Sequence, residues 1–155
     1  MWNMRRKDRQ ISRDESESIL KNGEYGVLST ISENGYPYGA PVNYCKIGNN
    51  LYFHCAEKGQ KINNLRHNDK VSFCVVGYTQ LLPEDYSTLY ESVIVFGRAY
   101  LVNDEEEKRN ALMELIEKYA AEYKSEAENY FKKWFSKTAV YGIKIEHITG
   151  KARRE

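Results

Sequence analysis

The sequence predicts a mainly β domain with flanking helices, in which six antiparallel strands close fully or partly into a barrel. Three observations support this class. Strand-like segments rich in β-branched and aromatic residues are joined mostly by short turns, helical segments follow only the third and fifth strands apart from one near the N-terminus, and 155 residues suit one domain. Because strands and helices do not alternate regularly, a doubly wound parallel sheet is not expected. Closure would remove exposed strand edges in so small a domain.

The strands are bounded by turn residues. Asn34-Gly35 tolerates positive φ and predicts a hairpin between the first two strands, and Gly97 predicts a bulge inside a long apolar strand. Pro37 and Pro41 remove ladder donors, so part of the second strand must be an edge or carry a bulge. We expect strands over about 25–32, 36–47, 51–56, 70–77, 89–102 and 139–148.

The remaining segments are predicted to be helices or connections. Ser12 and Glu15 form an S-x-x-E capping box that opens a short helix ending near Asn22-Gly23. Asn103 is expected to open another helix. Further helices are expected over about 58–68 and 125–135, an N-terminal arm over 1–11, a polar connection over 78–88 and a C-terminal tail over 150–155.

Charge and composition exclude several classes of protein. Lys plus Arg is 23 and Asp plus Glu is 22, so a protein-wide field that attracts nucleic acid is not expected. No apolar run approaches the roughly 18 residues that span a bilayer, and the basic N-terminus has no apolar stretch behind it, so we expect a cytoplasmic protein without membrane contact. The 13 tyrosines favour half-buried strands, an interface or the walls of a pocket for a flat ligand.

Metal and cysteine chemistry have little support in the sequence. Cys45, Cys55 and Cys74 show no CxxC spacing, so we expect buried thiols and no metal site. His67 is expected at the surface. His147 is expected on the apolar face of the last strand, which it shares by period with Tyr141, Ile143 and Ile145.

The junction between the third strand and the next helix carries the most specific local chemistry. Lys58, Lys61 and Arg66 lie around a helix start that follows a glycine, and free amides at a helix N-terminus together with lysines can bind phosphate. A solvated helix face would produce the same pattern. His54 lies within LYFHCA and shares a strand face with Tyr52, which suits either a structural or a functional histidine.

Several motifs keep a fixed order along nearly the whole chain. Residues 26–77, GVLSTISENGYPYGAPVNYCKIGNNLYFHCAEKGQKINNLRHNDKVSFCVVG, are followed by YESVIVFGRA and HITGKARR. The set resembles the FMN-binding split-barrel superfamily of pyridoxamine 5'-phosphate oxidase, and most closely its nitroimidazole-resistance (Nim-type) branch. The resemblance implies a six-stranded antiparallel split β-barrel that forms a homodimer with FMN at the subunit interface. It also implies an oxidoreductase that reduces a small flat acceptor such as a nitroaromatic.

The same resemblance implies roles for individual residues. Lys61 matches the position that binds the FMN phosphate, residues 41–43 match the strand along the isoalloxazine edge, and residues 52–54 match the strand beside it. His54 is the expected catalytic residue, orienting the acceptor or donating a proton, and Ser92 matches a position that reaches FMN across the dimer. The residues assigned to cofactor binding are Pro41, Val42, Asn43, Tyr52, Phe53, His54, Lys58, Gly59, Gln60, Lys61 and Ser92.

Two alternatives stay open at this point. The barrel could be a non-catalytic module that binds FMN, or haem with His54 or His67 as axial ligand, for sensing or storage. It could also be an assembly protein whose tyrosines serve only an interface. Oxidation of pyridoxamine phosphate itself is not expected, because HITGKARR stands where those oxidases end in an R-x-H-R-type segment.

Overall fold

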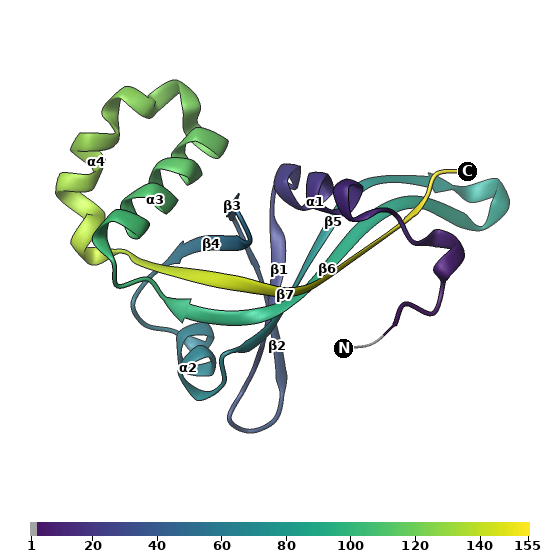
Figure 1. The fold of residues 1–155 in the computed structure, drawn as a ribbon, viewed down its shortest axis with the longest axis horizontal. Helices are drawn as coiled ribbons and strands as arrows, with labels where there is room; N and C mark the ends of the chain where they lie inside the picture. The colour runs from purple at the N-terminus through teal and green to yellow at the C-terminus, as the bar shows by residue number, and fades with distance from the viewer. Residues whose placement is uncertain (1–2) are drawn as a thin grey trace.

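The computed structural model describes residues 3–155 and contains one curved antiparallel sheet of seven strands, in the order β2-β1-β5-β6-β7-β4-β3 (Figure 1). The strands are β1 (Gly26–Ile31), β2 (Pro37–Val42), β3 (Cys45–Ile47), β4 (Asn50–Cys55), β5 (Lys70–Leu82), β6 (Ser87–Leu101) and β7 (Ala139–Arg153). The helices are α1 (Arg13–Asn22), α2 (Gln60–His67), α3 (Glu105–Ala120) and α4 (Ala127–Trp134). The predicted split-barrel class is confirmed.

The predicted strand over 36–47 is divided in two, which raises the count from six to seven. The division falls at Tyr44, whose backbone bonds to α3 instead of to a neighbouring strand. Its N–H donates to the Tyr119 hydroxyl at 3.1 Å, and its carbonyl accepts from Lys118 Nζ at 2.9 Å. The Tyr44 ring is fully buried and packs edge-on against Phe73. The chain therefore leaves one edge of the sheet after β2 and enters the other edge at β3.

Two strand pairs are longer than the sequence predicts. Residues 78–88 are not a polar connection, because β5 and β6 stay paired from Thr79↔Tyr90 to Leu82↔Ser87 and turn through a short 3-10 helix, η2 (Pro83–Asp85). β7 runs to Arg153, so most of the predicted C-terminal tail is strand. The outer part of the β5–β6 pair extends beyond the barrel interior, so it lacks the apolar alternation that marks a strand with one buried face.

The bulge predicted at Gly97 is present in the pairing of β6 with β7. The register shifts between Phe96 and Gly97, and Gly97 lies opposite Ile145. A Cβ on Gly97 would lie 2.3 Å from the Lys144 carbonyl oxygen, which explains the glycine. Because the bulge adds one residue to β7, Ile145 faces the barrel interior and His147 faces outward. The expectation that His147 shares the apolar face is therefore wrong.

Two apolar clusters hold the fold together. The first fills the barrel and includes Leu28, Phe53, Phe73, Val93 and Ile143, all fully buried. The second joins the β3–β4–β7 end of the sheet to the α3–α4 pair and contains Tyr52, Leu112, Leu115, Phe131 and Val140. The helix pair projects at one end of the molecule (Figure 1). Among the described residues no helix is both long and apolar enough to cross a bilayer.

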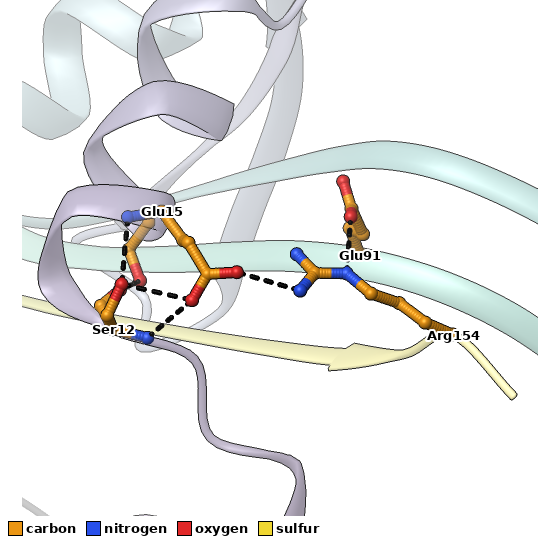
Figure 2. A network of polar contacts seen from close by, with 5 residues as sticks. Ser12, Glu15, Glu91 and Arg154 are labelled. Carbon is orange, nitrogen blue, oxygen red and sulfur yellow. Dashed lines mark hydrogen bonds and ion pairs between the residues drawn. The ribbon is translucent and has the colours of Figure 1, made fainter.

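The capping box predicted at Ser12 and Glu15 is confirmed, and it also joins α1 to the end of the chain (Figure 2). Ser12 Oγ accepts the Glu15 N–H at 3.2 Å, and Glu15 Oε2 accepts the Ser12 N–H at 3.0 Å. The other Glu15 oxygen pairs with Arg154 at 2.7 Å, and Arg154 also pairs with Glu91 at 3.0 Å. Arg154 first, and Ser12 second, lower the pKa of the Glu15 carboxyl to about 2.

Replacing Ser12→Ala should lower the free energy of unfolding by about 1 kcal/mol, because the first turn of α1 loses its side-chain acceptor. Urea denaturation measures the change. Ser18→Ala on the exposed middle of the same helix is the matched control and should stay within about 0.5 kcal/mol of the parent. Equal effects of the two substitutions would show that the cap does not stabilise α1.

Candidate functional site

The split of the barrel leaves two strand edges without a strand partner in the described chain. β2 pairs with β1 on one side only. β4 pairs with β7 along its length, but its pairing with β3 stops at Tyr52, so residues 53–55 have a partner on one side only. α2 lies below this region against β1, where Asn64 Nδ2 donates to Thr30 Oγ1 at 2.9 Å. The opening therefore presents backbone donors and acceptors next to a helix.

The N-terminus of α2 is an uncapped helix start with a cation beside it. Gly59 is the N-cap residue and has φ 138°, a conformation that side chains rarely adopt. It provides no side-chain cap, and the first turn contains no acidic residue. The first N–H groups of α2 therefore lack intrahelical acceptors. Lys61 follows two residues later, with Nζ 5.6 Å from the centroid of the Phe53 ring. This arrangement suits an anion such as a phosphate.

His54 and Asn43 line one small cavity under the helix pair. The cavity has a volume of about 170 Å³. Its other walls come from α3 and the α3–α4 region, namely Leu112, Leu115, Ile116, Tyr119, Ala120 and Tyr130. His54 is exposed to solvent, yet desolvation by the surrounding residues first and the Lys61 charge second lower the pKa of its imidazole. The ring is therefore neutral at neutral pH.

Two of the predicted site residues turn their rings away from the opening. Tyr52 is 5% exposed, and its hydroxyl donates to Glu107 Oε1 at 2.8 Å between the sheet and α3. Phe53 is fully buried in the barrel and stacks on Tyr141 at 5.8 Å between centroids. β4 can therefore meet a ligand through its backbone and His54, but not through these two rings.

The remaining predicted residues fall into separate places within one chain. Pro41 and Asn43 are exposed near the end of β2, while Val42 packs against the core. Lys58 lines a different cavity of about 530 Å³, which it shares with Arg66. The side-chain amide of Gln60 donates a hydrogen bond to Asn64 Oδ1 within α2.

Ser92 lies on the outer face of the sheet, away from His54. It stands opposite Lys151 in the β6–β7 pairing. Together with His147 these residues line a cavity of about 250 Å³. The structure thus brings Asn43 and His54 together in one cavity, with Lys61 close enough for its charge to act on His54, and leaves Ser92 on a separate surface.

Sequence reasoning missed the aromatic wall above His54. Tyr119 and Tyr130 come from the helix pair, and only their place on apolar helix stripes was visible in the sequence. That pattern predicts packing but does not say which strand residue the rings will meet. Among the described residues, no group of three or more His, Cys, Asp or Glu side chains could hold a metal ion.

The curved sheet, its split and the uncapped helix below it define a split-barrel protein. The sequence matches the pyridoxamine 5'-phosphate oxidase family over residues 12–152, and the chain belongs to that family. A search of curated proteins found no match.

Solved structures share the fold at low sequence identity. A proposed 5-nitroimidazole antibiotic resistance protein from Bacteroides thetaiotaomicron has 24% identity and a TM-score of 0.74, covering 92% of this chain and 86% of its own. A flavocytochrome from Azotobacter vinelandii has 20% identity and a TM-score of 0.80, covering 99% and 73%. An FAD-binding protein from Mesorhizobium loti has 22% identity and a TM-score of 0.69, covering 94% and 97%. These similarities establish the fold.

The lowered pKa of His54 predicts a pH dependence of stability. As the pH falls below about 6.5, the unfolded chain binds a proton at this position before the folded chain does. The free energy of unfolding should therefore decrease between about pH 7 and pH 5, and His54→Gln should make that decrease smaller.

Urea denaturation across this pH range measures the difference. His67→Gln, on the exposed surface of α2, is the control and should keep the parent slope. A His54→Gln protein with the full parent slope would show that the His54 environment does not disfavour the charged ring.

Proposed function

We propose that the protein is a homodimeric flavin-dependent oxidoreductase that holds FMN at the barrel split and reduces a small flat acceptor, such as a nitroaromatic. The observation that carries this proposal is the uncapped start of α2 with Lys61, next to His54 and Asn43. Membership of the pyridoxamine 5'-phosphate oxidase family supports it.

The residues at the split suit the parts of FMN. The phosphate is a dianion, which the first N–H groups of α2 and Lys61 would bind. The unpaired edges of β2 and of residues 53–55 offer backbone groups to the polar rim of the ring. The cavity at His54 is about 170 Å³, below the roughly 300 Å³ at which ligand pockets begin. One chain therefore supplies only part of the site.

The outer face of the sheet supports the proposal that a second copy of the chain completes the site. It carries Ser92 and the exposed apolar side chains of Ile31, Val76 and Ile94. An apolar sheet face in water is typical of an interaction surface. In a dimer with two-fold symmetry the same face would be used by both copies, so each would present Ser92 and Lys151 to the other.

The chain's own residues would act by holding and orienting. Bound FMN would supply the electron pair for reduction of the acceptor. Lys61 and the α2 amides would fix the phosphate, and with it the position of the ring relative to His54. Because the imidazole is neutral at neutral pH, His54 would donate an N–H hydrogen bond that orients the acceptor. The aliphatic residues of α3 would exclude water from that contact.

Absorbance and native mass test the cofactor and the assembly together. We expect the purified protein to show a flavin spectrum and a native mass of two chains with two FMN molecules. A Soret band without flavin would indicate the haem-binding alternative. Absence of flavin binding after addition of FMN would overturn the proposal.

Lys61→Ala should weaken FMN binding by roughly 1.5–3 kcal/mol through loss of a charged phosphate contact. Fluorescence titration measures the affinity. Riboflavin, which lacks the phosphate, should bind both proteins equally. Lys58→Ala is the matched control, because Lys58 faces another cavity and its replacement should have a much smaller effect. Equal losses for FMN and riboflavin would remove Lys61 from phosphate binding.

A further inference from the structure

The hairpin arm, residues 77–91, extends beyond the barrel, and none of its residues is buried. From Thr79↔Tyr90 to Leu82↔Ser87, β5 pairs only with β6, and β7 reaches no further along the arm than Tyr90. Tyr78, Leu81 and Tyr86 are 55%, 74% and 99% exposed. A two-stranded hairpin is marginally stable in water on its own, and exposed apolar side chains on it indicate a contact outside the chain.

Tyr86, at the tip of the arm, has a costly backbone conformation. It has φ 48° and ψ 44°, the left-handed region, and it is the one non-glycine residue with positive φ among residues 3–155. A bulky side chain disfavours this region, where glycine or asparagine would fit more easily. The ring is almost fully exposed, so it gains no packing within its own chain. Such a residue is typical of a functional contact.

The charged residues of the arm are all acidic. Residues 71–97 contain no Lys or Arg. Glu84 and Asp85 lie at the tip beside Tyr86, and no ion pair engages either carboxylate in the described chain. The tip is therefore acidic and aromatic.

A complementary surface lies on the helix pair. Trp134 is 42% exposed, and Lys133 Nζ and Lys137 Nζ lie 5.2 and 5.8 Å from its ring centroid. Tyr130 is 39% exposed one turn earlier. We call this basic, aromatic surface the α4 patch. Opposite charges and exposed rings on both sides suit a contact between the tip and the α4 patch.

The hairpin arm and the helix pair, which carry these two surfaces, lie at opposite ends of the molecule (Figure 1). In a dimer whose two-fold axis crosses the long axis, the arm of one copy therefore lies at the helix-pair end of the other. Leu81 and Tyr90 lie on the same side of the hairpin as Ser92, so the arm continues the outer face of the sheet.

We propose that the hairpin arm of one copy docks its acidic, aromatic tip on the α4 patch of a second copy. This inference rests on the homodimer of the proposed function. The helix pair forms the wall of the His54 cavity, so docking would hold that wall in place from the partner's side. Assembly and the shape of the site are thereby coupled.

Sedimentation equilibrium of the flavin-loaded protein tests this contact. Tyr86→Gly relieves the left-handed backbone, so the variant should fold at least as stably, yet its dimer dissociation constant should rise roughly tenfold or more. Glu84→Lys and Lys133→Glu should each raise the constant, and the two changes in one chain should restore it in part. Glu33→Lys, the same change in the exposed turn before β2, is the matched control and should leave it unchanged.

The outcomes separate this inference from the proposed function. An unchanged dissociation constant for Tyr86→Gly, a monomeric parent protein, or no restoration in the double variant would overturn the docking of the arm. Flavin absorbance of the same samples reports the cofactor independently. A flavin-free dimer that Tyr86→Gly weakens would support the arm contact while contradicting the proposed function.

Discussion

The hydrogen bonds between the Tyr44 backbone and α3 are the constraint on which the rest of the structure depends. They separate β2 from β3, which lie at opposite edges of the sheet, and so the barrel stays split between them. The ring of Tyr44 fixes the same point from inside, because it packs on Phe73 and its hydroxyl donates to the Leu20 carbonyl. One residue thus connects the barrel core, α1 and the helix pair. The opening that holds Asn43 and His54 follows directly from this connection.

The electrostatic potential at the split comes mainly from Lys61 and from the start of α2. Lys61 is the cation whose field reaches the imidazole of His54, and it follows an uncapped helix start that adds positive potential of its own. Both effects favour an anion at the loop and a neutral ring at His54. The aliphatic wall from α3 acts in the same direction on the ring, because burial disfavours its charged form. Anion affinity and a neutral hydrogen-bond donor therefore come from a single arrangement.

Features with local causes could be predicted from the sequence. The capping box of Ser12 and Glu15 and the Asn34-Gly35 hairpin each depend on a few neighbouring residues, and both are present. The register shift at Gly97 is present too, but its extra residue lies in β7. α3 begins after Asp104, one residue later than expected, because Asp104 instead of Asn103 accepts the capping N–H. The break at Tyr44 could not be predicted, since its partners lie about 75 residues away. The arm was missed because neither of its faces is buried in the barrel.

The candidate site divides in the same way. The loop of Gly59 and Lys61 and the strand position of His54 were visible in the sequence, and the structure places them near each other. The directions of the Tyr52 and Phe53 rings depend on which face of β4 meets α3 and which meets the barrel. The rings of Tyr119 and Tyr130 depend on how the helix pair sits on the sheet. Such choices are made by tertiary packing, which a pattern along one strand does not contain.

The extra residue in β7 decides which side chains face outward, so the outer surface depends on the number of residues in this strand as well as on their types. Every side chain after Glu146 has changed sides relative to the strand before it. Removal of that one residue would turn His147, Thr149 and Lys151 toward the interior and expose Ile148 and Ala152. In the last seven residues of β7, the side chains that now face the core would face solvent and the reverse, although no residue type would have changed. An insertion or deletion of one residue at this point would therefore change the outer surface more than a single substitution would.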